Sequence, residues 1–360
     1  TPPIPATFAI IPQLEGAFTL FALIIAIYYG GELVWRDRDR KFHEVVDATS
    51  LPGWAYMVPK TIAVALVLFA VLLVSVAGAV AVQAANGHFK FELGKYLAWY
   101  VAPTTADMLL IAVLSVFVQA LSPNKYVGWG IMTLYLVAGI TLANIGYDHP
   151  LILYGRTGFS PLSDMNRAAV GGALGWWLRL YWGGFAVLLA VIAHLLWRRG
   201  TETRLAPRMR RLPRRAASAA GALGLAGLLT AGASGAFLYN EMNVQNEYAS
   251  REDGEARLAE YEKKYLQYET LKQPSLTDVT LAIDIFPEER RMEARGSYTM
   301  VNDTGAPVET LHVRLPDEET KLLEVEVPGA VLESDDVRFQ HRIYRLETPL
   351  TLAAAGTADA

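Results

Sequence analysis

The sequence contains no cysteine and few charged residues. A 360-residue chain without thiols forms no disulfide framework, thiolate nucleophile or cysteine-ligated zinc site. Charged residues make up 19% of the chain and hydrophobic residues 52%, and the mean hydropathy is +0.24. A composition this apolar excludes an ordinary single-domain soluble protein.

Two common catalytic motifs are also missing. The sequence has no G-x-x-x-x-G-K-[ST] loop, whose backbone amides hold nucleotide phosphates, and the nearest candidate is Gly94-Lys95. It has no H-E-x-x-H zinc motif either, because Asp47 stands where His43-Glu44 would need a second histidine one helical turn later. We therefore predict no catalytic residue, no metal ligand and no resident cofactor in this segment.

Charge divides the chain into two unlike parts. Residues 1–238 carry 19 basic and 11 acidic side chains, whereas the remaining residues carry 13 and 25. The net charge of −4 therefore combines an apolar basic half with a polar acidic half.

Six segments of the basic half are long and apolar enough to cross a bilayer as helices, which takes about 20 residues each. They are residues 8–30, 61–83, 98–121, 127–146, 175–197 and 216–238. We expect residues 1–215 to form a membrane domain with five of these spans, and residues 216–238 to form a final transmembrane helix.

Lysine and arginine are concentrated in alternate connections between the spans. Residues 31–60 carry five, residues 122–126 one and residues 198–215 eight, against two each in 84–97 and 147–174. The positive-inside rule places the first three connections in the cytoplasm and the acidic half outside. We predict a multi-pass membrane protein, and the family resemblances given below imply the bacterial inner membrane. Because the basic run 198–215 lacks aromatic residues for base stacking, it suits lipid headgroups rather than nucleic acid.

Two acidic residues lie inside or at the rims of predicted spans, Glu15 and Asp107. A charge at mid-membrane costs at least about 2.5–3.5 kcal/mol on insertion scales. These side chains either face a pathway or a neighbouring helix, or lie near the outer interface where the cost fades. His194, near the cytoplasmic end of its span, is interpreted as a neutral packed histidine.

The most informative polar stretch is residues 30–61, in which charges of both signs alternate. Phe42, Val45 and Val46 have a helix-like spacing, and the pattern breaks at residues 50–53. This pattern predicts a short amphipathic helix at the cytoplasmic face. A solvated charged loop is the alternative interpretation.

The same stretch resembles permease subunits of ATP-binding-cassette exporters of the type-2 class. The matching residues are Glu32, Arg36, Arg38, Arg40, Glu44, Thr49 and Lys60. The resemblance implies a coupling helix that docks on a cytoplasmic ATPase subunit, which would supply the ATP, and a homo- or hetero-dimer of permeases. The sequence departs from the family at Phe42-His43, where Gly-Thr is frequent.

The acidic half begins with a predicted helical linker, residues 239–274. Leu258, Tyr261, Tyr265 and Tyr268 share one helix face, and Pro274 ends the helix. The apolar period then changes to two, which predicts a partial all-β domain of the β-sandwich type over residues 275–360. Its predicted strands are 279–285, 292–300, 311–315, 323–327 and 337–346. His312 and His341 are expected on strand surfaces.

Residues 278–316 are similar to the start of the N-terminal β-domain of aminopeptidase N-like gluzincins. No catalytic residue carries over, because the zinc motif of that family does not occur here. We interpret the chain as a fragment, and the resemblance implies a zinc peptidase domain, with its zinc, after Ala360. The first functional hypothesis is thus an exporter permease with an aminopeptidase-like extension. The alternative is a membrane-tethered zinc aminopeptidase, and whether the full-length protein is an enzyme stays open.

Overall fold

The computed structural model divides into two compact units, Thr1–Asp253 and Gly254–Ala360. It describes residues 6–49, 52–158, 162, 172–198, 205–246, 248–288, 291–315, 320–351 and 355–359. The first unit is helical and the second contains all of the described strands. The two units are described separately below.

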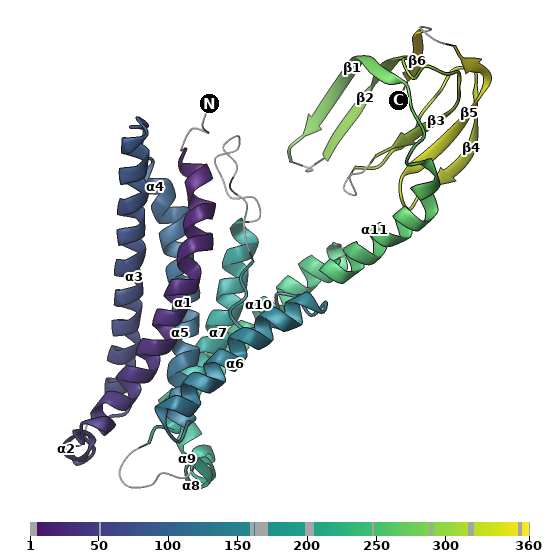
Figure 1. Ribbon diagram of the computed structural model, residues 1–360. Helices are drawn as coiled ribbons and strands as arrows, with labels where there is room; N and C mark the ends of the chain where they lie inside the picture. Colours follow the sequence, from purple (N-terminus) through teal and green to yellow (C-terminus); the bar gives the residue numbers. More distant parts are fainter. Residues whose placement is uncertain are drawn as a thin grey trace. The chain divides into compact units, whose positions relative to one another are not determined.

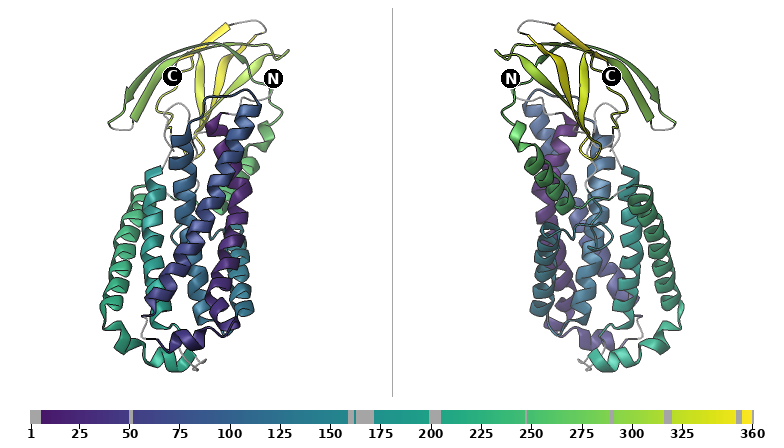
Figure 2. Two further views of the ribbon diagram at one scale, coloured as in Figure 1. Left: turned by 90° about the vertical axis from the view of Figure 1, so that its left-hand side faces the viewer. Right: turned by 90° about the vertical axis from the view of Figure 1, so that its right-hand side faces the viewer.

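Six helices of the first unit, here called the membrane unit, are long and apolar enough to span a bilayer. They are α1 (Thr7–Asp39), α3 (Trp54–Ala85), α5 (Ala102–Leu121), α6 (Lys125–Asn144), α7 (Gly172–Leu195) and α10 (Ala219–Tyr239), shown in Figures 1 and 2. The six predicted spans are therefore confirmed. However, α1 continues to Asp39 instead of ending at residue 30, so much of the predicted loop 31–60 is helical.

Short elements join or extend these helices. The helix α2 (His43–Asp47) lies between α1 and α3, and α8 (Leu205–Arg210) and α9 (Leu212–Ala216) precede α10. The helix α4 (Leu93–Tyr96) continues through a π-helical turn, η1 (Leu97–Val101), into α5. A second π-helical turn, η2 (Asn240–Gln245), extends α10.

The centre of the membrane unit is built from α1, α3, α5 and α6. Small residues of α1, Ala22 and Ala26, are fully buried against Val64, Leu68 and other apolar side chains. The large apolar side chains that remain exposed on these helices suit contact with lipid. Buried polar groups pair between helices or along the chain, as Trp35 Nε1 does with Gln119 Oε1 at 2.9 Å.

The helices α7 and α10 approach each other at two glycines, Gly184 and Gly227. A Cβ atom at Gly184 would lie 2.6 Å from the carbonyl oxygen of Gly227, and one at Gly227 would lie 2.7 Å from that of Gly184. Small residues permit this backbone approach where lipid provides no hydrophobic driving force.

The second unit, here called the β unit, contains two three-stranded antiparallel sheets, which confirms the predicted fold class. One has the order β1-β2-β6 and the other β3-β5-β4. The strands are β1 (Ser275–Phe286), β2 (Arg291–Val301), β3 (Val308–Arg314), β4 (Ala330–Asp336), β5 (His341–Leu350) and β6 (Ala355–Asp359). Leu311, Val327 and Tyr344 form a core that Met300 of β2 also contacts.

The predicted strand at residues 323–327 is wrong. Leu323 is 81% exposed, and the segment forms only an isolated bridge at residue 326, while the Tyr344 hydroxyl donates to the Val325 carbonyl at 3.1 Å. The next strand, β4, begins at Ala330. The predicted fifth strand also begins too early, because residues 337–340 form a turn in which Gln340 has a φ of 46°. The alternation of residue types did not reveal this turn.

The predicted linker helix is shorter than expected. The helix α11 runs from Arg251 to Tyr265 and is followed by one 3₁₀ turn, η3 (Leu266–Tyr268), so it ends well before Pro274. The boundary between the two units falls inside α11, after Asp253.

We predict that Gly184→Ala lowers the stability of the membrane unit by about 1–3 kcal/mol, because the added methyl group overpacks the contact with α10. Gly183→Ala is the matched control, since its Cβ would have no neighbour within 4 Å. Thermal unfolding of both variants in detergent checks this. Equal melting temperatures for the two variants would contradict the close approach.

Candidate functional site

A cavity of about 700 Å³ lies among α1, α5 and α7 in the membrane unit. Its wall combines apolar side chains, such as Leu23, Met108 and Ile111, with two tryptophans, Trp99 and Trp176. Ligand sites commonly have 300–1,000 Å³ and a mostly apolar wall with a few placed polar groups. The size and wall of this cavity fit that description.

An ion pair between Asp107 of α5 and Arg179 of α7 forms one side of the cavity. Arg179 donates from Nε to Oδ1 at 2.9 Å and from a terminal nitrogen to Oδ2 at 2.8 Å, and the Thr157 hydroxyl donates to Oδ1 at 3.0 Å. Such a two-bond pair fixes both position and orientation. Asp107 therefore faces a neighbouring helix, α7, and Arg179 compensates its charge.

Glu15 of α1 lines the same cavity but makes no hydrogen bond or ion pair with any described residue. The charged residues that interact with it electrostatically are Asp107 and Arg179, which already bind each other. The structure therefore brings the two predicted intramembrane acids to one cavity, and it leaves one carboxylate without a partner.

The residue that sequence reasoning missed here is Arg179. It lies within the predicted span 175–197, where an arginine is as costly as an aspartate. The sequence could have indicated this pair, because a basic and an acidic residue in two different spans can offset each other's cost of insertion.

The opposite end of the membrane unit, here called the basic end, collects the ends of α1, α5 and α7 and the starts of α3 and α6. Lys60 binds Asp37 at 2.6 Å, and Lys125 binds Glu32 at 3.2 Å and Asp39 at 2.9 Å. These ion pairs tie α1 to both α3 and α6.

Two arginines stabilise the basic end by donating hydrogen bonds to backbone carbonyl oxygens. Arg38 donates to the Arg198 carbonyl oxygen at 2.6 Å, and Arg208 donates to the Leu196 carbonyl oxygen at 2.8 Å. The ends of helices leave such carbonyls without partners inside the helix. Much of the positive charge at this end is therefore structural.

The predicted coupling residues separate into two groups. Glu32, Arg38 and Lys60 make the contacts just described, whereas Arg36, Arg40 and Glu44 are exposed and Thr49 binds only the Val46 carbonyl of its own turn at 2.7 Å. The predicted amphipathic helix occurs as α2, where Phe42 and Val45 are 56% and 63% exposed. Phe42 and Val45 are thus directed outward, whereas Val46 is half-buried and lines a small pocket with Val34 and Trp197.

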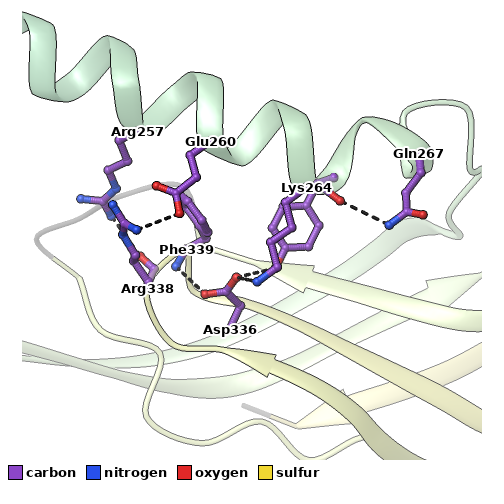
Figure 3. A network of polar contacts seen from close by, with 8 residues as sticks. Arg257, Glu260, Lys264, Gln267, Asp336, Arg338 and Phe339 are labelled. Atoms are coloured by element: carbon purple, nitrogen blue, oxygen red, sulfur yellow. Dashed lines mark hydrogen bonds and ion pairs between the residues drawn. The ribbon is translucent and has the colours of Figure 1, made fainter.

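In the β unit, α11 packs against the end of β4 and the following turn (Figure 3). Asp336 accepts hydrogen bonds from Lys264 Nζ at 2.5 Å, from the Tyr265 hydroxyl at 2.7 Å and from the Phe339 amide at 3.2 Å. Arg338 binds Glu260 at 2.8 Å. Although burial alone would raise it, these bonds lower the pKa of Asp336 to about 2.

His312 and His341 do not lie on a strand surface as expected. His341 is only 4% exposed, and its Nε2 lies 3.1 Å from Nδ1 of His312. Burial, then the nearby His312 and Arg314, lower the pKa of His341 to about 4. Burial also lowers the pKa of His312. Neighbouring strands brought these histidines together, which their separation in sequence did not reveal.

Among the described residues, no three His, Asp or Glu side chains are grouped so that they could hold a metal ion. Comparison with protein-family models, curated proteins and solved structures gave no match. The fold therefore defines a class only, a multi-span membrane protein followed by an antiparallel β region. Anything finer depends on the residues of the sites themselves.

We predict that the β unit loses stability as the pH falls from about 6.5 to 4. The pKa of His341 is about 4 in the folded unit against an ordinary 6.5, so the unfolded chain binds a proton that the folded chain does not. Exchange of β5 amide hydrogens in the full chain, measured across this range, reports the loss.

His341→Gln is expected to reduce this pH dependence but not to abolish it, because the pKa of His312 is lowered too. His88→Gln, in the membrane unit, is the control and should leave it unchanged. Unaltered pH dependence in His341→Gln would show that His341 titrates normally.

Proposed function

We propose that the membrane unit is the permease subunit of an ATP-binding-cassette exporter and that α2 docks on its cytoplasmic ATPase subunit. The observation that carries the proposal is α2 itself, a short helix with exposed apolar residues, at the end where positive charge collects. Positive charge marks the cytoplasmic end of membrane helices. A permease needs an ATPase subunit as its partner at this end, because its own sequence contains no phosphate-binding loop.

The surroundings of α2 suit a docking element. Phe42 and Val45 present an apolar surface. Burial of such a surface against a partner stabilises the complex. Arg36, Arg40 and Glu44 flank it as exposed charges, which would favour the correct orientation of a partner with complementary charges.

One ion pair joins the two long helices on either side of α2. The preceding helix α1 and the following helix α3 are joined by the Asp37–Lys60 ion pair beside α2. A push on α2 would therefore be passed to both helices, and α1 carries Glu15 in the cavity. The proposal thus links the basic end to the cavity through a single continuous helix.

The alternative, a membrane-tethered zinc aminopeptidase, has no observation in its favour among the described residues. It stays a prediction that the described residues do not test. A zinc determination on the full-length protein would test it independently of the transport proposal.

A single cysteine in α2 tests the proposed docking. The chain contains no cysteine, so Val45→Cys provides one attachment point for a photoactivatable thiol crosslinker. Irradiation of native membranes is expected to join the protein to a chain that binds ATP and has a phosphate-binding loop. The purified complex should hydrolyse ATP, and Val45→Asp should reduce this co-purification at least tenfold.

Phe89→Cys is the matched control, because Phe89 is, like Val45, an exposed apolar residue but follows α3, at the end remote from α2. It should not crosslink to the ATPase. If neither site captures an ATP-binding chain, or if both do so equally, the proposed coupling role of α2 is wrong.

A further inference from the structure

We propose that the cavity among α1, α5 and α7 binds an amphiphile whose polar group is a protonated amine, with Glu15 as the residue that pairs with the ammonium. The binding itself needs no ATPase. Only the statement that this ligand is the transported substrate rests on the proposed function.

The one charge that the spans leave unpaired on the cavity wall points to a cation. Arg179 and Thr157 already donate hydrogen bonds to the Asp107 carboxylate, and Arg179 also balances its charge. Asp107 therefore does not require a ligand as a further donor. Arg156 also lines the wall, and its side chain makes no hydrogen bond or ion pair with the described residues, but it lies in the connection after α6 and not in a span. Of the charged residues that lie in spans and line the cavity, Glu15 is the one without a hydrogen bond or ion pair to the described residues. An ionisable residue within a membrane segment is costly, and this cost is offset when a ligand of opposite charge binds.

The rest of the wall points to an apolar body attached to the cation. Leu23, Met108 and Ile111 supply aliphatic contacts, and Trp99 and Trp176 supply aromatic ones. A volume of about 700 Å³ accommodates a molecule much larger than ammonium or a metal ion. An alkyl chain with a terminal amine satisfies both parts of the wall.

Either of two sources can supply this chemistry. A lipid with an ethanolamine headgroup would enter from the bilayer, and a soluble amphiphilic amine would enter from water. Both carry an ammonium group on an apolar body, so the experiment must separate them.

Binding of tritiated dodecylamine to the full chain in phosphatidylcholine nanodiscs tests the proposal, because this lipid has no N–H donor. We expect saturable binding of one molecule per chain. Glu15→Gln should weaken it at least tenfold, since a neutral amide loses the charge-assisted hydrogen bond. Glu92→Gln is the control, because Glu92 already pairs with Lys95 outside the cavity, and it should bind like the wild type.

Competition identifies the chemistry and the source. Neutral dodecanol and anionic dodecanoate should each compete at least tenfold more weakly than unlabelled dodecylamine. Displacement by phosphatidylethanolamine added to the nanodisc, lost in Glu15→Gln, would make the bilayer the source. Sensitivity to free amine alone would make the ligand a soluble one.

Thr19→Trp is a second variant that keeps Glu15 and fills the cavity from α1. It should also weaken dodecylamine binding, so the proposal can still be tested if Glu15→Gln does not fold. The proposal is overturned if Glu15→Gln binds like the wild type while properly folded, or if dodecanol or dodecanoate competes as well as the amine. Because no ATPase takes part, this failure is distinct from failure of the α2 crosslink.

Discussion

The ion pair between Asp107 and Arg179 is the interaction on which the rest of the membrane unit depends. Each charge alone would be costly in a lipid-exposed helix, and each becomes tolerable because the other lies on the neighbouring helix. Two hydrogen bonds hold the pair, and Thr157 adds a third to Asp107. The pair therefore fixes α5 against α7 and gives the cavity one wall that is polar but already compensated. Glu15, on the facing helix, is what remains for a ligand.

The helix α1 connects the two regions to which we assign function. Glu15 lies near its start, and Asp37 and Arg38 lie in its last turns, where they bind α3 and the end of the α7 segment. At a rise of about 1.5 Å per residue, this helix is long enough to cross the bilayer. Under the proposed function, the docking of an ATPase at α2 would reach the cavity by this route. The β unit has its own core and its own polar contact with α11, so its stability is set locally.

Much of the architecture was predictable because the bilayer imposes it. Runs of about 20 apolar residues leave few alternatives to helices, and all six were found, with α1 extending beyond its predicted end and α3 beginning at Trp54, before its predicted start. The short helix α2 was predictable from Phe42, Val45 and Val46. Strands were harder, since alternation at 323–327 also occurs in a segment that Tyr344 and Arg342 hold by side-chain bonds. The pairing of Asp107 with Arg179, and of His312 with His341, depends on tertiary contacts between distant segments, which spacing in one sequence does not report.

The most direct test of the central role of the Asp107–Arg179 pair is a double-mutant cycle. Reversible unfolding of the full chain in mixed micelles would be compared for Asp107→Asn, Arg179→Gln and the double variant. Each single change should cost about 3–5 kcal/mol, because it leaves a largely buried charge without its partner. The double variant should cost clearly less than the sum of the two, by at least about 1 kcal/mol. Costs that simply add would contradict the proposed organisation of the membrane unit around this pair.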